Sequence, residues 1–160
     1  MIFIAEIKVK SPFTDLNRPA SFDMLRQLAV NYSDVISVHV EAPWGGNPNH
    51  INRFVRPYCQ NIPILAKGIH ATDEDIKNSL NYGADKVLVV GRIPRESLRP
   101  YCWIEPENLE QVREFSGVVP DIGMEQSVLE NWAQQGRDVG ECTGSALWST
   151  YSSFKYFQSK

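Results

Sequence analysis

Residues 1–13 read MIFIAEIKVKSPF, and their alternation predicts a β-strand with one charged and one apolar face. Alternate residues of a strand share a face, so Glu6 and Lys8 point the same way. The other face is wholly apolar and consists of Phe3, Ala5, Ile7 and Val9. This strand therefore either lies at the surface with an exposed ion pair or forms part of a barrel with an interior one. The apolar face and the Ser-Pro turn that follows favour the barrel.

The composition is typical of one globular domain spanning 1–160. Of the 160 residues, 42 % are hydrophobic and 22 % are charged, and the formal net charge is -3. This charge argues against a nucleic-acid partner, because duplex-binding domains usually carry a basic stripe. The sequence has neither an apolar run of transmembrane length nor a secretory signal. We therefore expect no membrane partner and a cytoplasmic location.

The cysteines and histidines have no metal-site spacing. Cys59, Cys102 and Cys142 are far apart and odd in number, which favours reduced thiols over disulfides. The three histidines are scattered as well. We therefore predict no metal site.

Short β-rich runs alternate with helical patterns along the chain. The seven strand candidates are residues 2–9, 34–41, 62–69, 85–91, 101–106, 117–123 and 138–144. This alternation predicts an α/β fold with a parallel sheet and right-handed crossovers. The first strand is not followed by the G-x-G-x-x-G fingerprint, which favours a (β/α) barrel over a dinucleotide-binding sheet. A complete eight-unit barrel usually needs at least about 200 residues. We therefore expect a shortened TIM-barrel-like fold of about seven strands, either reduced or completed by a partner.

Five segments have the periodic apolar residues of helices: 21–32, 50–58, 72–83, 106–115 and 125–136. Ser21 is the expected N-cap of the first segment. Thr72 and Asp75 resemble a capping box at the start of the third, and Gly83 is expected to end it.

The tail, residues 146–160, has aromatic side chains at steps of three. These residues are Trp148, Tyr151, Phe154 and Phe157. The spacing predicts a closing helix packed on the barrel. The alternative is that the same aromatic stripe forms a subunit interface, which would make the protein a homodimer.

Ionisable residues recur at the ends of the predicted strands, where barrel enzymes have their active sites. Glu6 and Lys8 end the first strand, and we expect them to pair because interior charges are costly alone. Lys67 ends an apolar strand, where burial suits a lysine to acid-base or Schiff-base chemistry. The remaining strand-end candidates are His39, Glu41, Glu105 and Asp121. Together they predict a catalytic site.

Small residues at two predicted strand-to-helix junctions indicate a phosphate site. These residues are Gly123, Gly144 and Ser145. They allow backbone N–H groups to approach an anion at a helix N-terminus, and barrel phosphate sites form after the last two strands. The alternative is that they form ordinary glycine turns.

The segment FIAEIKVKSPF resembles the first-strand motif F-I-A-E-I-K-x-x-S-P-S of indole-3-glycerol phosphate synthase, a barrel enzyme of tryptophan biosynthesis. Further similarities lie at residues 36–46, 62–90, 102–112, 118–124 and 140–147. The resemblance implies a carboxy-lyase that closes an indole ring on a carboxyphenylamino-deoxyribulose phosphate, with loss of carbon dioxide and water. It also implies that neither a metal nor an organic cofactor takes part.

The same resemblance assigns roles to individual positions. The implied catalytic positions are Glu6, Lys8, Lys67 and Glu105, and the implied phosphate-binding positions are Ser11, Gly123, Gly144 and Ser145. Lys67 would be the general acid and Glu105 a general base, while the Glu6–Lys8 pair would position and polarise the substrate. One acid and one base with separated pKa values suit this chemistry.

The chain also departs from the family pattern. Asp121 stands where the family has Glu, and Gly68 replaces the Asp that follows the catalytic lysine. The N-terminal extension and one βα unit have no counterpart. Two alternatives therefore stay open: a related barrel enzyme that acts on another sugar phosphate or a specialised-pathway substrate, and a non-catalytic barrel that binds a phosphometabolite or a protein.

Overall fold

The computed structural model describes residues 4–10, 21–116, 118, 123–125, 146–148 and 150–152. The first five strands are β1 (Ile4–Ile7), β2 (Val35–His39), β3 (Ile64–Lys67), β4 (Lys86–Val90) and β5 (Cys102–Glu105). Three shorter strands follow: β6 (Gly123–Glu125), β7 (Ala146–Trp148) and β8 (Thr150–Ser152). The α-helices are α1 (Phe22–Tyr32), α2 (Asp73–Asn81) and α3 (Leu109–Ser116). Shorter helical turns are Ala42–Trp44, Ile51–Val55, Arg56–Tyr58 and Glu96–Tyr101.

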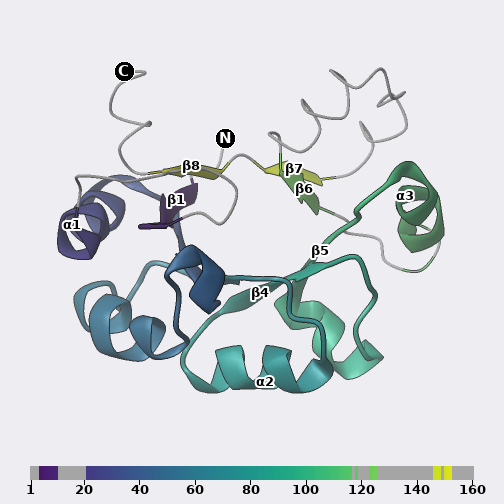
Figure 1. The fold of residues 1–160 in the computed structure, drawn as a ribbon, viewed down its shortest axis with the longest axis horizontal. Helices are drawn as coiled ribbons and strands as arrows, with labels where there is room; N and C mark the ends of the chain where they lie inside the picture. Colours follow the sequence, from purple (N-terminus) through teal and green to yellow (C-terminus); the bar gives the residue numbers. More distant parts are fainter. Residues whose placement is uncertain are drawn as a thin grey trace.

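A parallel sheet organises these elements. Its strand order is β5-β4-β3-β2-β1-β8, and β6 and β7 form a separate two-stranded parallel sheet. Figure 1 shows α1, α2 and α3 on the outside of the strands. The predicted α/β class and parallel sheet are confirmed. Within the described residues the strands do not close into a barrel by hydrogen bonding.

Local sequence signals set the helix ends as predicted. The Ser21 hydroxyl accepts a hydrogen bond from the Met24 backbone N–H at 3.3 Å and caps α1. Thr72 and Asp75 form the capping box of α2, since each side chain bonds the backbone N–H of the other. Gly83 follows this helix with a φ of 102°, a left-handed conformation that glycine adopts without steric cost.

The strand faces divide as the alternation of the first strand predicts. Ala5 and Ile7 of β1 lie in the apolar core. The helices contribute Leu25, Ala29, Ile51, Val55, Ile76 and Phe115 to the same core. Ile4, Leu65 and Leu88 are also buried but stand outside this cluster. Their alternate positions place them on the opposite face of the sheet, which also carries Glu6. We call this face, opposite the apolar core, the inner face.

The C-terminal region differs from the predictions. Residues 146–160 were expected to form one helix, but Ala146–Trp148 and Thr150–Ser152 are strands, so the helix prediction is wrong for these residues. Aromatic and β-branched residues favour a pleated strand, and β8 pairs with β1. The rest of the tail, the strand predicted at 138–144 and nearly all of the helix predicted at 125–136 lie outside the described residues. Among the described residues, no helix combines the length and apolarity needed to cross a membrane.

Candidate active site

A buried carboxylate joins the carboxyl ends of three adjacent strands. The Oε1 atom of Glu6 on β1 lies 2.8 Å from Lys67 Nζ on β3 and 2.7 Å from His39 Nε2 on β2. His39 and Lys67 are register partners, so their side chains leave the sheet side by side. The exposed fractions of the side chains are 9 % for Glu6, 13 % for Lys67 and 5 % for His39. The sheet therefore holds an acid, an ammonium group and an imidazole in one buried cluster.

The cluster stabilises the ionised form of Glu6. Burial raises the pKa of a carboxyl group, but here the Lys67 charge and the hydrogen bond from His39 outweigh it and hold the Glu6 pKa well below its usual range. Glu6 is therefore an anion at neutral pH. An ionised carboxylate only accepts hydrogen bonds, so both neighbours donate to it.

His39 is neutral in this setting. Burial lowers its pKa, and the positive charges of Lys67 and Lys8 lower it further, against the opposing effect of Glu6. A neutral imidazole that donates from Nε2 to Glu6 has an unprotonated Nδ1. The ring also stacks on Trp44, with centroids 5.8 Å apart and planes at 19°. His39 is thus held in one orientation and one tautomer.

The prediction that Glu6 pairs with Lys8 is wrong. In the described part of the chain, the ion-pair partners of Glu6 are Lys67 and His39. Lys8 lies one residue beyond the end of β1 and is half-buried. Lys67 lies on β3, two strands away from Glu6 on β1, and is the register partner of His39 on β2. Its flexible side chain can therefore reach across the inner face to Glu6.

Glu105 lies on the same inner face but on a more distant strand. It is buried at the end of β5, opposite Val90 of β4. Neighbouring strands are about 4.8 Å apart, and Glu105 lies two residues beyond the register position of Lys67, so their backbones are roughly 12 Å apart.

Several predicted residues are not placed at the site. Ser11, Asp121, Gly144 and Ser145 lie outside the described residues, so their predicted roles stay predictions. Gly123 was expected to end the strand 117–123 at a junction with a helix, but it is the first residue of β6, which continues to Glu125. The predicted strand end at Gly123 is therefore wrong, and its phosphate contact stays a prediction.

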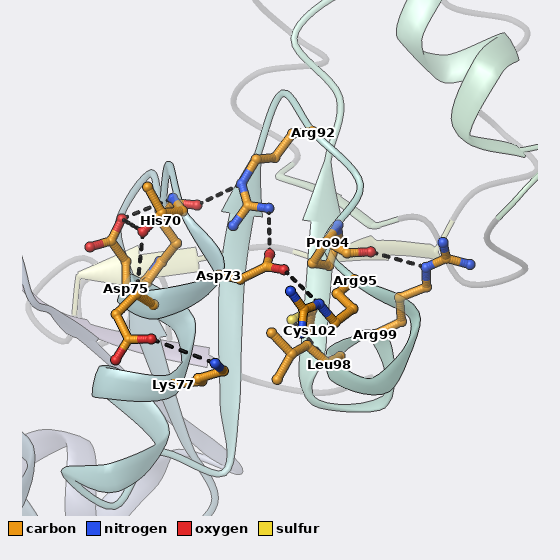
Figure 2. A network of polar contacts seen from close by, with 12 residues as sticks. His70, Asp73, Asp75, Lys77, Arg92, Pro94, Arg95, Leu98, Arg99 and Cys102 are labelled. Atoms are coloured by element: carbon orange, nitrogen blue, oxygen red, sulfur yellow. Dashed lines mark hydrogen bonds and ion pairs between the residues drawn. The ribbon is translucent and has the colours of Figure 1, made fainter.

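A second polar network fixes the loops that follow β3 and β4 (Figure 2). Buried His70 has a φ of 51°, and its Nδ1 donates to the Leu88 carbonyl at 2.6 Å while its Nε2 accepts from the Ser79 hydroxyl at 2.8 Å. Arg92 donates to the His70 carbonyl at 3.0 Å and to Asp73 at 2.8 Å. These contacts tie the loop directly after Lys67 to β4 and α2.

Glu41, another strand-end candidate, has a structural contact. Its Oε1 accepts a hydrogen bond from the Ile69 backbone N–H at 2.9 Å. The contact joins the loop after β2 to the loop after β3. Glu41 therefore helps to fix the loops around Lys67.

The described residues contain no cluster of three or more His, Cys, Asp and Glu side chains that could hold a metal ion. The donor groups of the buried cluster suit acid-base chemistry. Lys67 carries protons that it can donate, and carboxylates can accept them.

His39 is the site residue whose role the sequence did not reveal. It was among the strand-end candidates, but no individual role was predicted for it. The available signal was parity, because His39 and Ser37 share a face of β2. The register that places this face beside Glu6 is known only from the structure. A comparison of the chain with models of known protein families finds no match.

Proposed function

We propose that this chain is a (β/α) barrel enzyme, a lyase of the indole-3-glycerol phosphate synthase type. Its substrate would be a carboxyphenylamino-deoxyribulose phosphate. The observation that carries the proposal is the buried Glu6–Lys67 ion pair at the carboxyl ends of parallel strands, with Glu105 buried on the same face. Parallel-sheet enzymes bind their substrates at this edge.

Strand pairing in the C-terminal region supports the barrel part of the proposal. β7 and β8 are separated by a single position, 149, and yet β7 pairs with β6 while β8 pairs with β1. The strands on the two sides of this position thus pair with the small sheet and with the first strand of the large one. β6 also contacts β5 at the opposite edge of the large sheet. Hydrogen bonds between β5 and β6 would complete a ring, which has seven strands when β7 and β8 are counted as one.

The proposed mechanism assigns one role to each charged side chain. Lys67 donates a proton to the carbonyl oxygen as the ring carbon that bears the carboxylate attacks the carbonyl carbon, and carbon dioxide then leaves with its bonding electrons remaining on the ring. Lys67, reprotonated from solvent, donates a second proton to the resulting hydroxyl, which leaves as water. Glu105 accepts the proton lost from the carbon beside the nitrogen as the indole forms. Glu6 holds the Lys67 ammonium in place with a 2.8 Å contact. Acid and base in separate positions allow both proton transfers to occur on one bound molecule.

The ion pair favours acid-base chemistry over Schiff-base chemistry at Lys67. A Schiff base requires the neutral amine, because only its lone pair attacks a carbonyl. The adjacent anionic Glu6 stabilises the ammonium form. Borohydride should therefore fail to trap a sugar phosphate on Lys67, and trapping would favour the alternative enzyme class.

The test is turnover of the carboxyphenylamino-deoxyribulose phosphate, followed by the fluorescence of the indole product. Lys67→Arg keeps a positive charge beside Glu6, but a guanidinium does not release its proton, so we expect kcat to fall at least about 100-fold. Glu105→Gln should have a similar effect. Lys77→Arg and Glu74→Gln, at an exposed pair 3.5 Å apart, are the matched controls. Absence of turnover by the native chain, or full activity of Lys67→Arg, would overturn the proposal.

A further inference from the structure

Two side chains of β2 carry buried polar atoms for which the described residues supply no hydrogen-bond partner. These atoms are Ser37 Oγ and His39 Nδ1. Ser37 is 0 % exposed and His39 5 % exposed. The two residues are two positions apart on one strand, so both side chains point from the inner face, next to Glu6. Buried polar atoms in folded proteins nearly always have a partner, so this pair points to a bound group.

The chemistry of that group follows from the hydrogen bonds already made. His39 donates from Nε2 to Glu6 at 2.7 Å, so its Nδ1 must accept. The Ser37 hydroxyl can donate or accept. The missing partner therefore has to donate to Nδ1, and it can accept from Ser37. A hydroxyl oxygen does both.

A single oxygen can serve both atoms only if the two side chains lean toward each other. Residues two apart in a strand have Cα atoms about 6.6 Å apart, whereas an oxygen that makes two hydrogen bonds of about 2.8 Å bridges atoms at most about 5.6 Å apart. The hydrogen bond of His39 to Glu6, the register partner of Ser37, directs the imidazole toward the Ser37 row and so favours such a lean. The bridge would lie directly beside the register partner of Ser37, which is Glu6.

We propose that Ser37 and His39 form a subsite for one hydroxyl oxygen, supplied either by a water molecule or by a hydroxyl group of a bound substrate. The oxygen donates a hydrogen bond to His39 Nδ1 and accepts one from Ser37 Oγ. It fixes the tautomer that donates to Glu6, and His39 is therefore a positioning residue for the Glu6–Lys67 pair. The subsite rests on the geometry of β2 and does not require lyase activity.

Nitrogen NMR of histidine-labelled protein tests this proposal without any substrate. An O–H donor moves the Nδ1 resonance of His39 upfield from the position of a free lone pair. Ser37→Ala removes one anchor of the oxygen and should move that resonance downfield. Ser79→Ala is the matched control, because Ser79 contacts His70 at 2.8 Å and should move the His70 signal alone. If Ser37→Ala fails to fold, Ser37→Cys repeats the measurement with a side chain of similar size.

The source of the oxygen is distinguished by adding an unreactive ligand, the substrate with its ketone reduced to a hydroxyl. An upfield Nδ1 signal in the protein alone, with an ordered oxygen near both atoms in a crystal structure, identifies a water molecule. An upfield shift that requires the reduced ligand identifies a substrate hydroxyl, and His39→Gln should then weaken its binding about tenfold. An Nδ1 signal at the free position under both conditions, or a proton on Nδ1, overturns the subsite. Failure of turnover would overturn only the lyase proposal.

Discussion

Replacing Lys67 with methionine should destabilise the fold strongly, because it leaves Glu6 buried without its ammonium partner. The side chains are only 9 % and 13 % exposed, so solvent screens the pair little. Breaking a buried pair by removing one member typically costs about 3–5 kcal/mol. We expect the lower end, about 3 kcal/mol at pH 8, because His39 Nε2 still donates to Glu6 at 2.7 Å. For a domain of this size, that loss lowers Tm by roughly 6–12 °C.

The same variant should lose less stability in mild acid. The Lys67 charge lowers the His39 pKa in the native protein, so its removal raises that pKa. His39 can then bind a proton more readily in mild acid and replace the missing positive charge beside Glu6. The difference between the variant and the native protein should therefore shrink between pH 8 and pH 5.5.

Urea denaturation at the two pH values measures both effects. Lys77→Met is the control, since Lys77 is 48 % exposed and its change should stay within about 0.5 kcal/mol. A loss at pH 8 no larger than that of Lys77→Met would refute the buried ion pair. A loss that is the same at pH 5.5 and pH 8 would refute the compensation by His39.

Two further predictions concern pH and thiol reactivity. Burial lowers the pKa values of His39 and His70, so below about pH 6.5 the unfolded chain binds more protons than the native one. Stability therefore falls as the pH falls, by up to about 1.4 kcal/mol per pH unit for each of these two histidines. Glu6, whose pKa is lowered from 4.5, adds to the loss of stability below about pH 4.5. A free energy of unfolding that stays constant from pH 8 to pH 5 in urea titrations would contradict the histidine contribution. Burial also raises the pKa of Cys102 to about 11 and raises that of Cys59. Both thiols should therefore resist iodoacetamide in the native protein and react with it in urea, which peptide mass mapping measures. Rapid labelling of either thiol without denaturant would contradict their burial.

The sequence was informative wherever the signal was local. Alternation in residues 1–13 was sufficient to assign Ala5 and Ile7 to the core and Glu6 to the other face. The cap of α2 depends on Thr72 and Asp75, three residues apart, and was read directly from the chain. Local periodicity and capping operate over a few residues, so no long-range information was needed.

Contacts between distant residues were predicted less well. Glu6 was matched with its sequence neighbour Lys8, whereas its partner is Lys67, which the chain brings close through the register of β1, β2 and β3. Strand register depends on tertiary packing and cannot be read from one strand. The helix prediction for the aromatic tail was wrong for a related reason. Aromatic residues at steps of three fit a helix, but the pairing of β8 with β1 favours a strand.

The buried cluster is better explained by chemistry than by stability. Apolar side chains of similar volume in place of a buried ion pair often leave a protein equally or more stable. The inner face already carries buried Ile4, Leu65 and Leu88, so an apolar layer could have continued to the carboxyl ends of the strands. Instead, Glu6 and Lys67 occupy this end with His39 fixed beside them. Strongly perturbed ionisable groups at the carboxyl edge of a parallel sheet are typical of functional sites, which is why we place the candidate active site here.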